Sequence, residues 1–186
     1  MDLSKISKCG TIKEFKQDDI ICIEGSEGHT AFLVLKGCVK VVIGTFDVKS
    51  KDLAIIPVGS IFGEMSMLEN APRSATIIAG NEGVTVLEIN KDDFLNLMKT
   101  EPELAYNLLR TLYNRIENTM KEAGTYLISY SAEIRRNKYY ADIANLTLQS
   151  FTVIVAQKED YVFKLLSYLS HTLSDLNKEL MNRINK

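Results

Sequence analysis

IFGEMSMLENAPRSAT, residues 61–76, is the stretch of sequence that says most about this chain. Gly63 permits a close backbone approach, and the residues from Glu64 onward can form one helical turn whose free amide groups attract an anion. Arg73 adds a forked cation, and Ser74 adds a hydroxyl donor. Together these groups supply what a buried phosphate monoanion needs, so the stretch predicts a phosphate site.

Glu64 is the unusual group in such a site, because a carboxylate repels a phosphate. Its presence indicates a ligand that also carries hydroxyl donors, and a ribose 2′-hydroxyl beside the phosphate meets that need. One alternative is a structural ion pair between Glu64 and Arg73 that only stabilises a loop. For Ser74 the alternative is a turn hydroxyl that bonds its own backbone. The length and order of the surrounding pattern favour ligand binding at Glu64 and Arg73.

Glycine and proline divide the chain into two parts. All ten Gly and all three Pro lie at or before Gly124, and the 62 residues that follow contain neither. We therefore predict turn-rich β structure first, with about eight strands and with turns at Gly37 and at residues 80–83, and helices afterwards. The strand-like runs are apolar on both faces, which is typical of a filled roll.

The predicted fold is thus mainly β with helices: a double-stranded β-helix, or jelly-roll-like β-roll, with flanking helices and a helical C-terminal extension. Asn90 is expected to cap a short helix. Thr100 and Glu103 form a possible capping box for a second helix that ends at Gly124. Apolar positions recur at heptad spacing along this second helix. They are Ala105, Leu109, Leu112, Ile116, Thr119 and Ala123.

Residues 61–76 resemble the phosphate-binding cassette of the cyclic-nucleotide-binding domain family, as found in catabolite-activator-like regulators and in sensor domains like those of protein kinase A regulatory subunits. The resemblance rests on FGEMS from Phe62 and PRSAT from Pro72, and it extends over roughly Lys13 to Gly124. A further set of residues, before residue 61, resembles the hairpins of the family, in which glycines lie between the strands. These are Gly25, Gly28, Phe32, Val34, Gly37, Val39 and Val41.

The resemblance implies a role for each matching residue. Glu64 would take the ribose 2′-hydroxyl, and Arg73 the cyclic phosphate. Thr119, in the long helix, would contact the adenine amino group, although a threonine that bonds back to its own helix is the alternative. Backbone groups or pocket walls would come from Gly63, Met65, Ala75, Val41, Leu53 and Ile56. Because serine rather than threonine stands at Ser74, the expected ligand is cyclic AMP, with cyclic GMP as a weaker competitor.

We expect residues 1–124 to form the cyclic-nucleotide-binding domain and residues 125–186 a helical extension. Residues 140–157 resemble a degenerate helix-turn-helix, whose second helix from Phe151 to Ala156 lacks Arg, Lys or Asn to read bases and has a strand as its alternative. A second heptad seam follows at Val162, Leu166, Leu169, Leu173, Leu176 and Leu180. We interpret it as a homodimer or partner contact, with a helix folded back on its own chain as the alternative. DNA binding is expected to be weak but is not excluded.

Composition limits the other function classes. The net charge of −2 provides no general field for a polyanion. His29 and His171 are too few for a metal centre with several histidine ligands, and Cys9, Cys22 and Cys38 match no metal or redox spacing. No catalytic set can be assembled, so we expect a sensor rather than an enzyme. The start of the chain has no long apolar run, which favours a cytoplasmic protein without a membrane span.

Overall fold

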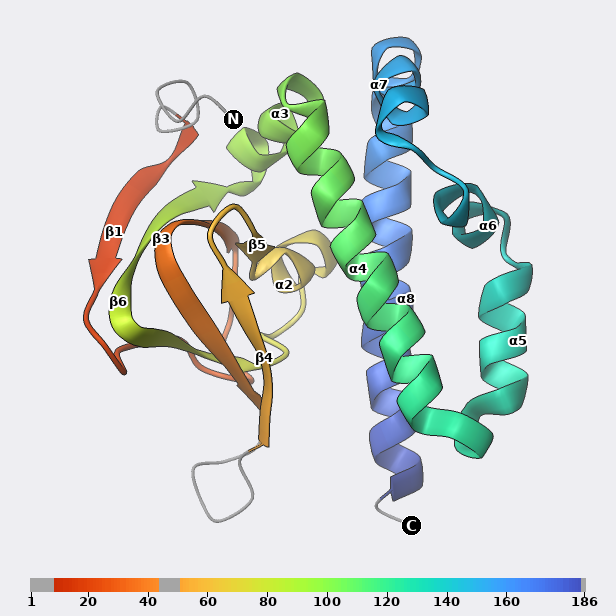
Figure 1. The fold of residues 1–186 in the computed structure, drawn as a ribbon, viewed down its shortest axis with the longest axis horizontal. Coiled ribbons are helices and arrows are strands. Elements are labelled where there is room, and N and C mark those ends of the chain that lie inside the picture. Colours follow the sequence, from red (N-terminus) through yellow and green to blue (C-terminus); the bar gives the residue numbers. More distant parts are fainter. Residues whose placement is uncertain (1–8, 44–50, 185–186) are drawn as a thin grey trace. The chain divides into compact units, whose positions relative to one another are not determined.

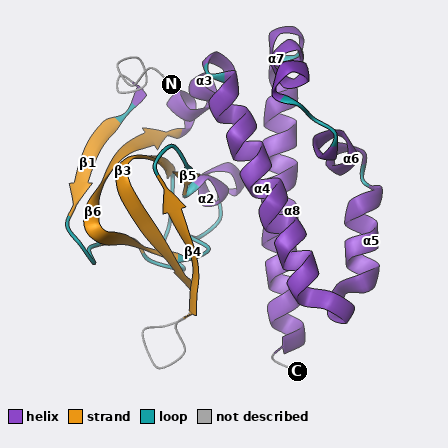
Figure 2. Cartoon of the chain, in the orientation of Figure 1, coloured by secondary structure: helices purple, strands orange, loops and turns teal. Residues whose placement is uncertain are grey.

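The computed structural model describes residues 9–43 and 51–184 of the chain (Figure 1). The described strands all lie before Lys91, and the long helices follow them (Figure 2). This order agrees with the division that glycine and proline predicted. The described helices include none that is long and apolar enough to cross a membrane.

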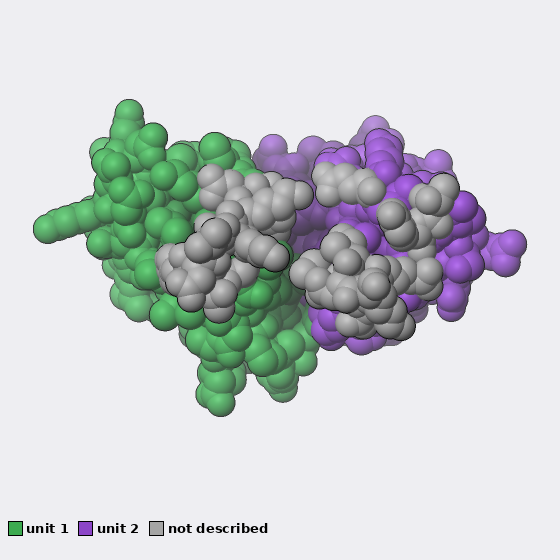
Figure 3. All heavy atoms as spheres, turned by 90° about the horizontal axis from the view of Figure 1, so that it is seen from below, with its two compact units in different colours: residues 1–97 green, residues 98–186 purple. Residues whose placement is uncertain are grey.

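The chain divides into two compact units, residues 1–97 and residues 98–186 (Figure 3). This division differs from the predicted boundary after Gly124, because the long helix is grouped with the helices that follow it. The predicted extent of the ligand-binding domain, residues 1–124, stays a prediction. The two units are described separately below.

The first unit is an antiparallel β-roll with one short helix inserted between its strands (Figure 1). Its sheet has the strand order β1-β6-β3-β4, while β2 pairs with β6 and β5 pairs with β3. The elements up to residue 90 are β1 (Thr11–Phe15), β2 (Ile20–Cys22), β3 (Thr30–Ile43), β4 (Lys51–Pro57), β5 (Ile61–Phe62), α2 (Glu64–Glu69) and β6 (Thr76–Asn90).

Two of the expected turns are bends within long strands. Gly37 lies inside β3 and Gly83 inside β6, and both have a positive φ, 77° and 72°. A Cβ atom on Gly37 would overlap the carbonyl oxygen of Gly83, so the two backbones approach more closely than side chains allow. The ladder between β3 and β6 shifts register on either side of Gly37. Glycine therefore lets both strands curl without ending, and within the described residues the roll has fewer and longer strands than predicted.

The interior of the roll is filled by side chains from strands β2 to β6. Phe32 and Phe62 stack in it with ring centroids 5.0 Å apart. The buried cluster consists of Cys22, Phe32, Val34, Val39, Ile56, Phe62, Ile77, Ala79, Val84 and Val86. Interior residues alternate with outward ones along a strand, and Leu33, Leu87 and Ile89 are fully buried outside this cluster. Parts of β3 and β6 are thus buried on both faces, which explains the continuous apolar runs in the sequence.

The helix boundaries follow two of the three predicted signals. Asn90 caps α3 (Lys91–Thr100), since its Oδ1 accepts from the backbone N–H of Asp93 at 2.9 Å. Gly124 ends α4 (Pro102–Ala123) with a φ of 50°. The capping box of Thr100 and Glu103 was wrong, because Thr100 is still helical and Glu101 stands at the N-cap of α4 without a side-chain bond.

The second unit is helical. After α4, the 3-10 turn η2 (Gly124–Leu127) leads to α5 (Ile128–Arg136), α6 (Lys138–Ala144), α7 (Leu148–Gln157) and α8 (Glu159–Ile184). The segment from Phe151 to Ala156 is therefore helix, and the strand alternative was wrong. Thr147 caps α7 through a reciprocal pair of bonds with Ser150, which accounts for the helical start.

The two heptad seams pack on each other within one chain. Helices α4 and α8 are in contact and run in the same direction (Figure 1). Leu109, Leu112 and Ile116 of α4 are fully buried, as are Leu166 and Leu169 of α8. The folded-back alternative is thus what the structure shows for these seams, because each apolar face covers the other.

Helices α6 and α7 are held against α4 by polar groups at their ends. Tyr106 donates to the carbonyl of Leu146 at 3.1 Å, and Arg110 donates to the carbonyl of Ile143 at 3.2 Å. Carbonyls at the end of a helix have no partner within it, so these side chains cap α6 and fix the turn that leads to α7. The result is a helix, a three-residue turn and a second helix where the sequence resembled a helix-turn-helix.

Candidate nucleotide-binding site

The start of α2 depends on Gly63, which has a φ of 74°. A Cβ atom there would lie 2.6 Å from Nη1 of Arg73 and 3.3 Å from the carbonyl oxygen of Thr30. Both the backbone angle and the lack of space require glycine. The segment that follows turns inward, so that Glu64, Met65 and Ser66 are buried.

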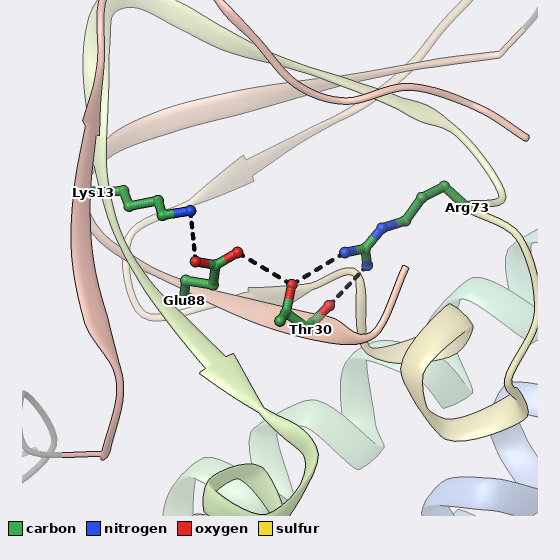
Figure 4. A network of polar contacts seen from close by, with 4 residues as sticks. All are labelled: Lys13, Thr30, Arg73 and Glu88. Atoms are coloured by element: carbon green, nitrogen blue, oxygen red, sulfur yellow. Dashed lines mark hydrogen bonds and ion pairs between the residues drawn. The ribbon is translucent and has the colours of Figure 1, made fainter. Parts of the chain in front are cut away.

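Arg73 is buried, and its guanidinium is fixed by oxygen atoms of the protein. Nη1 donates to the carbonyls of Thr30 and Gly63 at 2.8 and 2.9 Å, and to Oγ of Ser66 at 2.9 Å. Nη2 donates to Oγ1 of Thr30 at 3.3 Å (Figure 4). All four acceptors are uncharged oxygens, so these bonds orient the cation without neutralising it.

The loop that carries Arg73 is held from the other side. The backbone N–H of Arg73 donates to the carbonyl of Ser26, and the N–H of Gly25 donates back to the carbonyl of Arg73, both at 2.8 Å. A Cβ atom on Gly28 would overlap the guanidinium. Phe32 lies beneath it, with its ring centroid 5.6 Å from Cζ. Arg73 is therefore clamped between glycines and an aromatic face.

Glu64 is 1% exposed and lies two residues before Ser66, which binds Arg73. Glu64 makes a polar or electrostatic interaction in the structure, while its Oε1 is buried and accepts no hydrogen bond from the described residues. A carboxylate oxygen is an acceptor only. The chain thus places a buried acceptor at the start of α2 and a fixed cation in the loop that follows it, which is the pair of groups that a sugar phosphate requires.

The remaining predicted site residues lie in the roll, except for Thr119. Ser74 is exposed next to Arg73, Ala75 is half-buried, and Met65 is buried. Ile56 belongs to the interior cluster, and Val41 packs against it. Leu53 lies in β4, but its side chain is outside what the structure describes. Thr119 is half-buried in α4, in the second unit.

The structure adds residues that sequence reasoning missed. Thr30 and Ser66 bind the guanidinium directly. Glu88 and Lys13 lie behind Thr30 and are linked to it. The serine of FGEMS was visible in the sequence, but no local pattern marks Thr30, because it lies 43 residues from Arg73 and only the folded chain brings the two together.

Two other groups lack the features of a reactive or metal centre. Burial raises the pKa of the Cys22 thiol, while the positive charge of Arg73 opposes that rise in pKa. Cys22 is thus an uncharged member of the interior cluster. Within residues 9–43 and 51–184, no three His, Cys, Asp or Glu side chains gather as metal ligands would.

Comparison with known proteins assigns this geometry to a family. The family described as the cyclic nucleotide-binding domain matches residues 12–101. The Cyclic AMP receptor protein of Thermus thermophilus is 32% identical over 124 residues, which are 67% of this chain and 55% of that protein. Human cGMP-dependent protein kinase 2 is 30% identical over 136 residues, which are 73% of this chain and 15% of that protein. The chain therefore spans about half of the first relative and a small part of the second.

The likeness of fold extends further along the chain. The crystal structure of the Thermus thermophilus Catabolite Activator Protein aligns with a TM-score of 0.54 and 23% identity, over 97% of this chain and 83% of that one. At this identity the alignment establishes the fold, a β-roll followed by helices. The match over residues 12–101 and the relative that is 32% identical over 124 residues show that the chain belongs to the cyclic nucleotide-binding domain family.

Proposed function

We propose that this chain is a cyclic-nucleotide sensor that binds cyclic AMP, with cyclic GMP as the weaker ligand, and that it has no catalytic activity of its own. Arg73 takes the cyclic phosphate and Glu64 the ribose 2′-hydroxyl. Binding alters the arrangement of the C-terminal helices, including residues 125–186. Such coupling requires only that the ligand binds one arrangement more tightly than another.

The observation that carries the proposal is the guanidinium of Arg73. It is buried and oriented by four bonds to uncharged oxygens. Burying a cation is costly, and the hydrogen bonds that the structure gives this cation among the described residues all go to uncharged oxygens. An anion that binds the remaining donors of the fork offsets that cost. A cyclic phosphate carries a single negative charge, which matches a single guanidinium.

The choice of cyclic AMP has separate support. Serine stands at Ser74, where family members that prefer cyclic GMP often have threonine. The resemblance also implies a contact between Thr119 and the adenine amino group. One matched relative is named for cyclic AMP and another for cGMP, so the family likeness supports either base. The proposed preference for cyclic AMP rests on these two residues.

Titration calorimetry with cyclic AMP, cyclic GMP and 5′-AMP tests the proposal on the full chain. We expect heat of binding with both cyclic nucleotides, a lower dissociation constant for cyclic AMP, and no saturable heat with the open dianion 5′-AMP. Absence of binding by both cyclic nucleotides would remove the proposal. Tighter binding of cyclic GMP would leave the sensor function but reverse the base preference.

A second candidate function is a transcription regulator of the catabolite-activator type. It is favoured by the helix pair α6 and α7 with its three-residue connection. The exposed face of α7 argues against this function, because its exposed residues carry no positive charge that could bind DNA phosphates or guanine. They are Leu148, Gln149, Ser150, Thr152, Val153, Ala156 and Gln157. We therefore place it second to a sensor that acts through protein contacts.

Fluorescence anisotropy with a duplex DNA library, with and without cyclic AMP, separates the two candidates. The sensor predicts weak binding that falls steeply with salt at any ligand level. Tight binding of one defined DNA sequence only in the presence of cyclic AMP would instead support the transcription regulator. Light scattering on the same sample tests the predicted homodimer, which would need surfaces other than the seams that α4 and α8 bury in each other.

A further inference from the structure

A chain of polar contacts leads from the surface of the roll to Arg73 (Figure 4). Nζ of Lys13 lies 2.6 Å from Oε2 of Glu88. The other oxygen of that carboxylate, Oε1, accepts from the hydroxyl of Thr30 at 3.4 Å. The hydroxyl of Thr30 in turn accepts from Nη2 of Arg73 at 3.3 Å. Strands β1, β6 and β3 each contribute one of the first three residues.

The direction of these bonds is set by what each group can donate. A hydroxyl has one proton and two lone pairs, whereas a carboxylate has acceptors only. Thr30 must therefore give its proton to Glu88, which leaves its lone pairs facing Arg73. A hydroxyl oriented in this way cannot turn its proton toward the guanidinium, so it remains an acceptor for Nη2.

The hydroxyl of Thr30 binds Nη2, the part of the guanidinium that the other contacts do not bind. Three oxygens bind Nη1, from Thr30, Gly63 and Ser66. Within the described residues, only the hydroxyl of Thr30 binds Nη2. If the protein bound only Nη1, the plane of the guanidinium could rotate about that atom. The Thr30 hydroxyl therefore determines which edge of Arg73 is presented to a ligand.

The charges of Glu88 and Lys13 matter as well. A bare carboxylate behind Thr30 lowers the potential at Arg73 and disfavours an anion there. Lys13 compensates this charge through its contact with Glu88, which is a diagonal pair across β1 and β6, since Thr11 is the register partner of Glu88 and Lys13 that of Val86. The carboxylate can thus orient Thr30 without repelling a phosphate.

We propose that Thr30 is a positioning residue for Arg73, and that the Lys13–Glu88 pair holds the Thr30 hydroxyl while keeping the site positive. The affinity for a cyclic phosphate is then set in part by residues that do not touch it. This inference rests on the proposed function of Arg73, and it assigns the regulation of the same site to the outer strands of the roll.

Thr30→Val and Thr30→Ser test the positioning role, because valine keeps the shape and serine keeps the hydroxyl. By calorimetry, Thr30→Val should bind cyclic AMP about fivefold more weakly, as expected for loss of one hydrogen bond to a charged group, and Thr30→Ser should stay within about twofold of wild type. The ratio of affinities for the two phosphorothioate diastereomers of cyclic AMP should fall toward one in Thr30→Val, since an unfixed fork distinguishes the two exocyclic oxygens less well.

A double-mutant cycle tests the charge compensation. Lys13→Gln leaves Glu88 uncompensated and should weaken cyclic AMP binding by about threefold at low salt, while Lys13→Gln/Glu88→Gln should bind within about twofold of wild type. Both positions are partly exposed, so these variants should fold even where Thr30→Val does not. Lys40→Gln, which removes a lysine paired with Asp18 elsewhere on the roll, is the matched control and should bind as wild type does.

The outcomes separate the two hypotheses. If wild type binds neither cyclic nucleotide, the proposed function fails. If wild type binds cyclic AMP but Thr30→Val has an unchanged affinity and an unchanged diastereomer ratio, Thr30 is only a strand residue and the positioning role is wrong. If Lys13→Gln binds as wild type does at low salt, the charge compensation is wrong.

Discussion

The guanidinium of Arg73 occupies the space that a side chain on Gly28 would need. A Cβ atom built on Gly28 overlaps Nε of Arg73 and lies 2.5 Å from Cζ. The φ of Gly28 is outside the left-handed region, so the requirement for glycine there is spatial. The glycine of the β2–β3 loop and the arginine of the α2–β6 loop therefore depend on each other.

Gly28→Ala should displace Arg73 and weaken cyclic AMP binding by about tenfold, since overpacking a buried site costs about 1–3 kcal/mol. Calorimetry measures the loss of binding, and thermal unfolding measures the loss of stability. In an Arg73→Ala background the same alanine should cost little stability, because the overlapping group is gone. An equal cost in both backgrounds would show that Gly28 acts on something other than Arg73.

Arg73→Lys keeps the charge but loses the fork. The single ammonium group of lysine cannot bind the oxygens of Thr30, Gly63 and Ser66 in place of Nη1 and also contact a phosphate. We expect cyclic AMP binding to weaken by about 1–3 kcal/mol. Arg110→Lys in α4 is the control for a general effect of this substitution, and it should leave the affinity unchanged. Unchanged binding by Arg73→Lys would place the phosphate elsewhere.

Thr119→Val deletes a hydroxyl and keeps the shape of the side chain. Among the described residues the structure provides no partner for this hydroxyl, whereas Thr111 on the same helix bonds back to the carbonyl of Asn107 at 2.9 Å. We expect cyclic AMP to bind about 1 kcal/mol more weakly, and the ligand to protect residues 125–186 less well from protease. Thr111→Val should change neither. Unaltered affinity and protection would make Thr119 a seam residue only.

Tyr161 links α8 to α6 by donating to Oδ2 of Asp142 at 2.6 Å. Burial and this bond raise the pKa of Tyr161 to about 12, and burial with the Glu117 contact raises the pKa of Tyr140 as well. A raised pKa in the folded state means that the contribution to stability is complete below about pH 10 and is lost as the pH rises toward 12.

Urea denaturation of wild type and Tyr161→Phe at pH 8, 10 and 12 measures this dependence. The difference in unfolding free energy between the two should shrink across that interval. Tyr106→Phe, which loses a bond to the carbonyl of Leu146, is the control for removal of a hydroxyl. A difference that stays constant from pH 8 to 12 would contradict the assignment.

Local sequence was sufficient for the features that depend on neighbouring residues. The inserted turn after Gly63, the cap at Asn90 and the helix end at Gly124 all follow from side chains within a few positions of the backbone that they shape. The order of β structure and helices followed from glycine and proline. Glu64 and Arg73 were found because they lie nine positions apart in one recognisable segment.

Only the tertiary structure decided the features that depend on strand register and on which helix faces pack against each other. Gly37 and Gly83 are bends rather than turns because the strands that carry them lie side by side. The apolar pattern of α8 was equally compatible with a second chain, and only the folded chain shows that α4 covers it. Thr30 reaches Glu88, 58 residues away, because β3 and β6 pair in one register, and no local pattern encodes a contact over that separation.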